Sequence, residues 1–320
     1  MIIIPKKEGV FMRKKVCLIT LLFMFLVVVT SYSGNGIPTA VNHVQAKNAE
    51  TQSFDPVFPV LTDRKSPADR SFLYLGSDND YRKISNQSIM AVLWSQTAAE
   101  NKALYYQGFN IGKNLIDESL NNEDSQKKRA IVLDIDETVL DNSPYFAYLI
   151  ERAETFPFHW DKWINSASAK PLPGALDFLH DADSKGIAIF YVSNRDDHLL
   201  KATIENLIKF GFPQVDESHV ILKSADENKG ARREVIEENY TIIALFGDNL
   251  GDFSDVFNGK EFASRIDEAD KLKEQYGSKF VVFPNPMYGN WEWTLYNDNL
   301  KMKPSEKIKA RKESLTIFEP

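Results

Sequence analysis

The stretch AIVLDIDET, residues 130–138, decides the fold, because a short apolar run ends there in acidic and hydroxyl side chains. The same pattern returns in IAIFYVSNR at residues 187–195 and in TIIALFGDN at residues 241–249. Apolar runs of this length are typical of buried strands. The alternation of such runs with helical segments predicts an α/β fold with a parallel central sheet. The expected crossover helices are residues 174–185, 197–210 and 231–238.

Acidic side chains stand where the first and third runs end. Asp134 and Asp136 are two residues apart, so they project similarly from an ending strand and repel each other unless a cation lies between them. Asp248 and Asp252 follow the third run. Parallel strands end at one edge of a sheet, where ligands bind in open α/β folds, so we expect these carboxylates to gather. Oxygen donors without histidine or cysteine favour a hard cation, and Mg²⁺ is the usual choice beside phosphate oxygens.

The ordinary alternative is an Asp-x-Asp on a solvated turn, and the apolar run before Asp134 argues against it. Hydroxyl and basic side chains near the same edge favour an anionic substrate. Ser193 ends the second apolar run, and a lysine before the third run, Lys229 or Lys223, could supply a cation.

The composition favours a small substrate. The chain has 320 residues, 43% of them hydrophobic and 26% charged, which suits a globular protein with a substantial core. Its net charge of −7 disfavours a nucleic-acid polymer as a partner. The single cysteine, Cys17, cannot form an internal disulfide, and the sequence holds neither a P-loop nor a Gly-x-Ser-x-Gly elbow.

The N-terminal residues 1–46 are interpreted as a secretory signal peptide. A basic stretch at residues 12–15 precedes an apolar run at residues 16–29, and residues 44–46 have the small-residue pattern of a cleavage site. Residues 1–11 are interpreted as an extension upstream of Met12. The run is short for a membrane span, so cleavage is favoured over anchoring. We therefore expect a secreted, extracellular or cell-wall-associated protein without stable membrane insertion, and a flexible linker at residues 47–84.

Helical spacing and aromatic density mark the regions beside the predicted sheet. Apolar positions between residues 85 and 120 recur at helical spacing, and we expect two helical stretches there, interrupted near Gly108 and Gly112. Residues 141–171 are rich in aromatic side chains, most of which we interpret as packing residues.

The motifs resemble those of the haloacid dehalogenase (HAD) superfamily. The resemblance is carried by four motifs: Asp134-x-Asp136-x-Thr138, Ser193, a lysine before the last strand and the string GDNLGD at residues 247–252. The strings DETVLDNSPY at residues 136–145 and FPNPMYGNW at residues 283–291 are similar to the secreted and lipoprotein class C acid phosphatases. The resemblance runs over residues 90–318. It implies a HAD-like Rossmannoid parallel sheet flanked by helices in residues 85–320, with a smaller, mostly helical cap from segments around 85–122 and 141–172.

The resemblance also implies residue roles. Asp134 is expected to be the nucleophile that forms an aspartyl-phosphate, and Asp136 the general acid and then the general base. One Mg²⁺ per active site would be held by Asp134, the Asp136 backbone carbonyl and Asp248, with Asp252 in or beside the coordination shell. The residues implied in phosphate binding are Ser193, Asn194 and Lys229, with Lys223 as the alternative lysine. Class C members often carry a lipid-attachment cysteine after the signal, which this sequence lacks.

Trp160 and Tyr288 match positions implied in stacking the base of a substrate. The expected substrate is therefore a small phosphomonoester, a 5′-nucleotide or another aromatic one. A phosphotransferase that uses an alcohol in place of water stays open at this point. A catalytically idle storage or ligand-binding relative on the same fold is the other alternative, although Asp134, Asp136, Ser193, Lys229 and Asp248 are all present. The oligomeric state is not predicted.

Overall fold

A five-stranded parallel sheet forms the centre of the computed structural model, which describes residues 78–122, 127–224, 228–259 and 261–320. The strand order is β5-β4-β1-β6-β7, and each neighbouring pair is parallel. The predicted α/β class and parallel sheet are confirmed. The strands are β1 (Lys128–Leu133), β4 (Ala188–Asp196), β5 (Val220–Lys223), β6 (Tyr240–Gly247) and β7 (Phe280–Val282).

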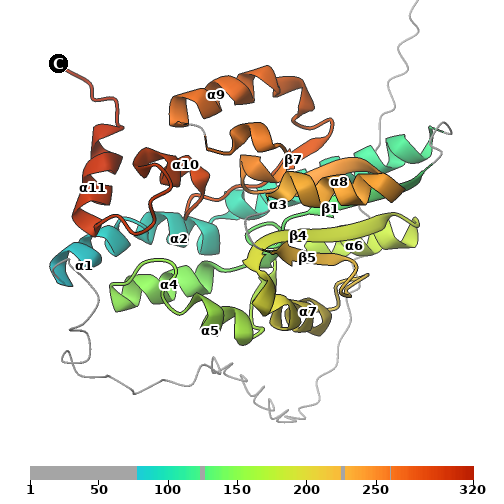
Figure 1. The fold of residues 1–320 in the computed structure, drawn as a ribbon, viewed down its shortest axis with the longest axis horizontal. Helices are drawn as coiled ribbons and strands as arrows, with labels where there is room; N and C mark the ends of the chain where they lie inside the picture. The colour runs from blue at the N-terminus through green and yellow to red at the C-terminus, as the bar shows by residue number, and fades with distance from the viewer. Residues whose placement is uncertain (1–77, 123–126, 225–227, 260) are drawn as a thin grey trace, which may run out of the picture. The chain divides into compact units, whose positions relative to one another are not determined.

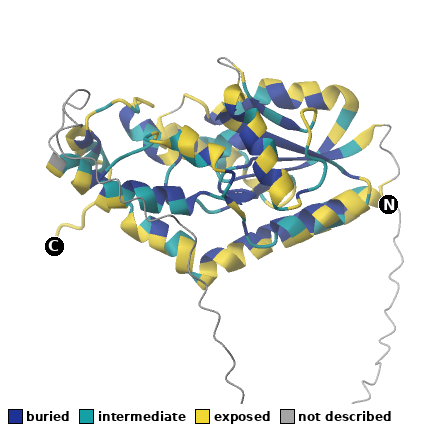
Figure 2. Cartoon of the chain, turned by 90° about the horizontal axis from the view of Figure 1, so that it is seen from below, coloured by how far each residue is buried: buried dark blue, intermediate teal, exposed yellow. Residues whose placement is uncertain are grey.

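Helices cover both faces of this sheet, which explains why its strands are apolar without alternation. Ile131 and Leu133 of β1 pack into one cluster with helices α3, α6 and α7, whereas Ala130 and Val132 pack into a second cluster with α8. The strands are accordingly buried, and the helices turn an exposed face outward (Figure 2). The bounds are α3 (Ala99–Leu120), α6 (Ala175–Ser184), α7 (Leu200–Lys209), α8 (Lys229–Asn239) and α9 (Phe262–Lys271).

Helix α3 corrects the prediction of two stretches interrupted near Gly108 and Gly112, because it runs through both glycines without a break. Both are buried, and a Cβ atom at Gly112 would lie 2.7 Å from the ring of Phe246. Because glycine has no Cβ atom, α3 can lie close to Phe283 at Gly108 and close to Phe246 at Gly112. Helix α3 therefore belongs to the sheet domain and not to the cap, in which residues 85–122 were expected.

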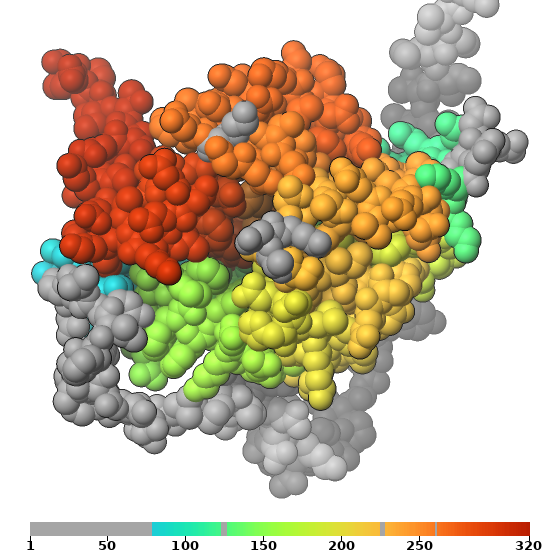
Figure 3. Space-filling view, in the orientation of Figure 1, coloured from blue at the N-terminus to red at the C-terminus, as the bar shows by residue number. Residues whose placement is uncertain are grey.

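The second group of helices forms the cap. It includes a helix that begins before residue 85 and helices near the C-terminus, neither of which belonged to the expected cap segments. Helix α1 begins at Asp78, so the linker expected at residues 47–84 ends before that residue. The C-terminal helix α11 contacts α1, and α4 contacts α1 and α2. These helices lie to the left of the sheet in Figure 1, and in Figure 3 the C-terminal segment lies directly above the one that holds α4. The cap helices are α1 (Asp78–Asn86), α2 (Ile89–Thr97), α4 (Ser143–Arg152), α5 (Trp160–Asn165), α10 (Asn290–Trp293) and α11 (Pro304–Glu313).

Short elements join these parts. An antiparallel pair, β2 and β3, connects the loop after β1 to the segment before α6. The bounds are β2 (Leu140–Asp141), β3 (Lys170–Pro171) and the 3-10 helices η2 (Asp197–Leu199), η3 (Leu250–Asp252), η4 (Asp255–Phe257), η5 (Lys273–Gln275) and η6 (Thr294–Tyr296). The predicted signal peptide and most of the predicted linker lie outside the described residues. Within the described part, no helix has the length and apolar character needed to cross a bilayer.

Candidate active site

The loop after β1 places two aspartates at the carboxyl edge of the sheet. The backbone N–H of Asp134 donates to the carbonyl of Phe246 in β6 (2.9 Å), which continues the strand pairing to that residue. The chain then turns tightly, with Glu137 in a left-handed conformation (φ 54°) and its N–H donating to the carbonyl of Leu140 (2.9 Å). The turn therefore holds Asp134 and Asp136 where β4 and β6 also end.

Of the four aspartates expected to gather at this edge, three form one cluster, and the fourth, Asp136, is paired with Arg195. Asp134, Asp248 and Asp252 each offer an oxygen atom within 4.8 Å of the others. Lys229, the first residue of α8, forms ion pairs with Asp134 and with Asp252, the latter at 2.8 Å. Asn285 donates its amide to Asp248 (2.7 Å). Of the two candidate lysines, Lys229 lies in this cluster, and its side chain is only 4% exposed.

The charges in this cluster perturb one another strongly. Burial raises the pKa of Asp134 to about 7 against the attraction of Lys229, and the carboxylates of Asp252 and Asp136 add to the rise. Burial, together with Asp252 and Asp134, also raises the pKa of Asp248 well above its usual range. Burial lowers the pKa of Lys229, but Asp134 and Asp252 outweigh this effect, so the ammonium stays charged. One lysine leaves three crowded acids under-compensated, and an all-oxygen donor set of this kind fits a hard divalent cation.

A second group of contacts surrounds Asp136. Arg195 in β4 donates from Nη2 to Oδ1 (2.6 Å) and from Nε to both carboxylate oxygens (3.1 Å). Asn142 donates its amide to Oδ1 (2.7 Å), and the Ser193 hydroxyl lies 3.4 Å from Oδ2. The structure thus brings together Asp136 and Ser193, both predicted, with Arg195 and Asn142, which were not. Arg195 was detectable in principle, since it stands two residues after Ser193 and projects to the same side of the strand.

Residues 79–291 match the family model of the HAD superfamily, subfamily IIIB (Acid phosphatase). The chain belongs to this family. In structure it is similar to the class C acid phosphatase from Bacillus anthracis, with 47% sequence identity and a TM-score of 0.72 over 74% of this chain and 100% of that one. The same values hold for the form of that enzyme with tungstate bound.

Curated plant proteins are more distant relatives of this subfamily IIIB member. Acid phosphatase 1 of Solanum lycopersicum is 29% identical over 49% of this chain and 57% of its own length. The stem 28 kDa glycoprotein of Glycine max is 28% identical over 50% of this chain and 60% of its own length. The chain thus spans somewhat less than two thirds of the curated relatives it matches.

In this subfamily IIIB site, Asn194 takes a different position from the other predicted phosphate-binding residues. It is exposed, and its side-chain oxygen accepts from Nη2 of Arg232 in α8 (2.6 Å). Arg232 also donates from Nη1 to the Ser193 carbonyl (2.6 Å). The structure therefore brings Ser193 and Lys229 to the two aspartate groups, whereas the oxygen of Asn194 is turned to α8.

The two residues expected to stack the substrate base, Trp160 and Tyr288, stand on different elements of the acid phosphatase fold. Trp160 begins α5, packs edge-on against Tyr145 with ring centroids 5.0 Å apart, and lies 6.0 Å from the Arg195 guanidinium. Tyr288 stacks on Phe146 at 4.7 Å, and its hydroxyl donates to the Glu137 carboxylate. Burial and the Glu137 charge raise the pKa of Tyr288 well above its usual value, so its hydroxyl stays protonated.

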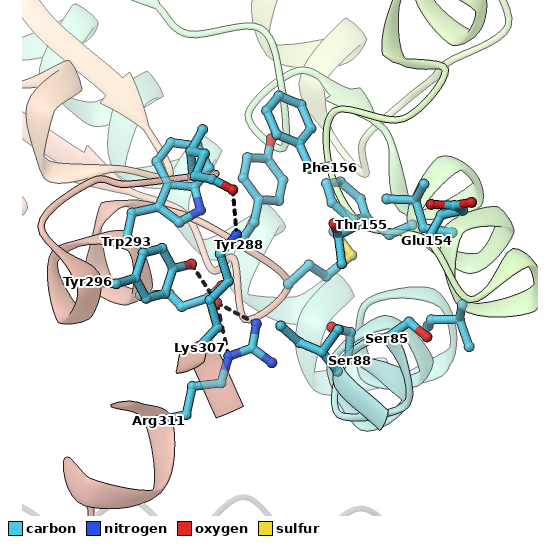
Figure 4. A pocket seen from close by; sticks show the side chains of 17 residues that line it. Ser85, Ser88, Glu154, Thr155, Phe156, Tyr288, Trp293, Tyr296, Lys307 and Arg311 are labelled. Atoms are coloured by element: carbon cyan, nitrogen blue, oxygen red, sulfur yellow. Dashed lines mark hydrogen bonds and ion pairs between the residues drawn. The ribbon is translucent and has the colours of Figure 1, made fainter. Parts of the chain in front are cut away.

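Tyr288 also lines a pocket in the cap. Its ring lies with those of Phe156 and Trp293 at the top of Figure 4, above Lys307 and Arg311. Trp160 is absent from the described lining of this pocket, although it contacts Phe156 edge-on at 5.5 Å. Two aromatic residues of the segment 141–171, Phe146 and Phe156, line this pocket, whereas Trp160 packs against Tyr145 and Phe156.

Proposed function

We propose that the protein is a secreted, Mg²⁺-dependent acid phosphatase that hydrolyses phosphomonoesters, with 5′-nucleotides as its preferred class. The observation that carries the proposal is the placement of Asp134 against Lys229, Asp248 and Asp252 with Asp136 and Ser193 beside them. A nucleophile, a proton-transfer group, cationic donors and a hard-cation site then meet at one sheet edge, which is the set that phosphoryl transfer requires.

The proposed reaction has two steps. Asp134 attacks phosphorus, the bond to the ester oxygen breaks, and Asp136 gives its proton to the leaving alcohol. Asp136 then takes a proton from water as the water attacks the aspartyl-phosphate, which releases phosphate and restores both carboxyl groups. Lys229 and the Ser193 hydroxyl donate to phosphoryl oxygens. Asp134, the Asp136 carbonyl and Asp248 would hold Mg²⁺, with Asp252 in or beside its coordination shell, and the ion would supply further positive charge to those oxygens.

The substrate preference rests on aromatic side chains near this site. Trp160 lies beside Arg195, which binds Asp136, and Tyr288 is joined to Glu137 in the same loop as Asp136. Stacking on aromatic rings stabilises a bound base by about 1–3 kcal/mol. The Bacillus anthracis enzyme binds tungstate, a tetrahedral oxyanion shaped like phosphate, which supports an oxyanion site in this chain.

The test is phosphate release from a 5′-nucleoside monophosphate by the purified protein at mildly acidic pH, with Mg²⁺ and with a chelator. We expect release that the chelator removes and Mg²⁺ restores, and none from Asp134→Asn. Vegetative storage protein 1 of Arabidopsis thaliana is 27% identical over 41% of this chain and 51% of its own length, so a storage protein on the same fold is the second candidate. A folded protein that releases no phosphate from nucleotides or aryl phosphates would favour it. Product analysis with added alcohol separates hydrolysis from phosphotransfer.

The proposed location follows from the signal peptide expected at residues 1–46. Expression of the full chain in a secreting host should deliver a protein that begins after residue 46 to the medium. Retention of the full chain in the membrane fraction would contradict secretion and support anchoring.

A further inference from the structure

We infer that Glu137 is a positioning residue that connects Tyr288, expected to stack the substrate base, to the proton-transfer group Asp136. The Tyr288 hydroxyl then acts on catalysis as well as on binding. The inference rests on the proposed phosphatase function. It concerns a buried acid that the two proposed steps do not use.

Glu137 is held from three sides. It is 2% exposed, and its Oε1 accepts from the backbone N–H of Asn142 (2.8 Å). Its Oε2 accepts from the Tyr288 hydroxyl and from the Asn142 amide, the latter at 3.3 Å. Its carbonyl accepts from the Tyr105 hydroxyl (2.6 Å). A buried carboxyl group with these partners fixes the position of the groups that donate to it, since an unpartnered buried polar group is costly.

The connection continues from Glu137 to Asp136 through Asn142. The Asn142 amide nitrogen donates to Asp136 Oδ1 (2.7 Å) as well as to Glu137. Trp163 donates from Nε1 to the Asn142 oxygen (2.7 Å), which turns the nitrogen toward the two acids. Asn142 is fully buried, so water does not replace these partners. A change at the Tyr288 hydroxyl therefore affects the hydrogen bond that Asn142 donates to Asp136.

The contacts from Tyr288 through Glu137 and Asn142 to Asp136 predict an effect that would not follow if Tyr288 only stacked on the substrate. Tyr288→Phe keeps the ring that faces Phe146 but leaves Glu137 Oε2 with its longer contact to Asn142 only. The Asn142 amide is then the remaining donor to Oε2, so we expect it to shift toward Glu137 and its hydrogen bond to Asp136 Oδ1 to weaken. Proton donation by Asp136 matters most when the leaving group is a basic alkoxide, and little when it is 4-nitrophenolate.

The experiment compares kcat/KM of Tyr288→Phe for glycerol 3-phosphate and for 4-nitrophenyl phosphate. We expect a loss of about tenfold for the alkyl ester, as for one lost hydrogen bond to a buried carboxylate, and a loss of less than about twofold for the aryl ester. The matched control is Tyr296→Phe, which removes a tyrosine hydroxyl from another buried carboxylate, Glu292 (2.7 Å), in the same pocket. It should affect both esters equally and slightly.

Each outcome decides the inference. Unchanged kcat/KM for glycerol 3-phosphate in Tyr288→Phe overturns it, and so does an equal loss for both esters, which indicates general distortion. A crystal structure of Tyr288→Phe tests the inference without turnover. The distance from Asn142 Nδ2 to Asp136 Oδ1 should be longer than the 2.7 Å of the wild type, and it should not change in Tyr296→Phe. If the wild type releases no phosphate, the proposed function fails, and this structural comparison still tests the connection.

Discussion

Arg195 clasps Asp136 through two guanidinium nitrogens, with Nη2 2.6 Å from Oδ1 and Nε 3.1 Å from both oxygens. The arginine side chain is almost completely buried, and its Nη1 donates to the Thr203 hydroxyl (3.1 Å). A planar fork fixed at both ends leaves the carboxylate little freedom to rotate. Arg195 therefore orients the group proposed to transfer protons and does not itself give one up.

The first prediction concerns this clasp. Arg195→Lys keeps the charge but loses the fork, so Asp136 loses at least one charge-assisted hydrogen bond. We expect kcat/KM for a phosphomonoester to fall about ten- to hundredfold, which corresponds to about 1.5–3 kcal/mol. Steady-state kinetics measure the loss. The control is Thr203→Val, which removes only the distal contact and should cost much less. Equal losses in the two variants would mean that Arg195 acts through packing.

The sheet and the acidic cluster were predictable because their signals are local. A buried parallel strand is an apolar run, and Asp134 and Asp248 each follow such a run directly. The Arg195–Asp136 clasp was not predicted, because it depends on the tight turn around Glu137 and on the adjacent positions of β1 and β4. A sequence read along one strand does not reveal which acid a basic side chain meets.

The errors in the helices have a similar origin. Two glycines weaken an isolated helix, so the pattern suggested a break in residues 85–120. The structure keeps α3 whole because both glycines lie against phenylalanine rings. Helix α11 belongs to the cap because of contacts between residues that are distant in the sequence. Arg311 donates to Gln87 (2.7 Å), 224 positions away, and pairs with Glu292. Helical periodicity carries no information on such partners.

The packing of α3 gives the second prediction. Gly112→Ala would place a Cβ atom 2.7 Å from the Phe246 ring and 2.9 Å from that of Phe178. Overpacking costs about 1–3 kcal/mol, more than the gain of about 1 kcal/mol in helix propensity. We expect Tm to fall, measured by calorimetry. Asn114→Ala, at an exposed position of the same helix, should raise Tm slightly. A higher Tm for Gly112→Ala would show that α3 can move away from the sheet.

Metal removal gives the third prediction. Asp248 is half-buried and lies beside the buried Asp134 and Asp252. Without a cation these carboxylates repel one another, so Asp248→Asn should raise the Tm of the chelator-treated protein by a few degrees, about 2–4 °C for each kcal/mol relieved. The same variant should lose the rise in Tm that Mg²⁺ gives the wild type. Thermal melts with and without Mg²⁺ measure both effects. A variant still stabilised by Mg²⁺ as strongly as wild type would place the cation elsewhere.

The fourth prediction is a pH dependence at the cap. His198 Nε2 lies 2.9 Å from Asp161 in α5, next to Trp160, and this bond raises the pKa of His198 above its usual value. The contribution to stability is therefore fully present below the unfolded pKa of about 6.5 and is lost as pH rises through the folded value. His198→Ala should lower Tm relative to wild type at about pH 5.5 and not at about pH 8.5. His180→Ala, an exposed histidine of α6, should show no such difference. The same Tm difference for His198→Ala at both pH values would contradict the bond.

The last prediction separates recognition from chemistry at Trp160. Trp160→Ala removes the ring, and a 5′-nucleotide then loses stacking of about 1–3 kcal/mol, or about five- to 150-fold in KM. An alkyl phosphate has no ring to stack, so its KM should change little and serves as the internal control. Trp160→Phe keeps an aromatic face and should recover most of the nucleotide affinity. Because Trp160 also packs on Tyr145 and Phe156, a purely structural part would raise KM for both substrates alike. Equal increases for the nucleotide and the alkyl phosphate would therefore assign Trp160 to the packing of α5 and move the search for the base-stacking wall to Tyr288.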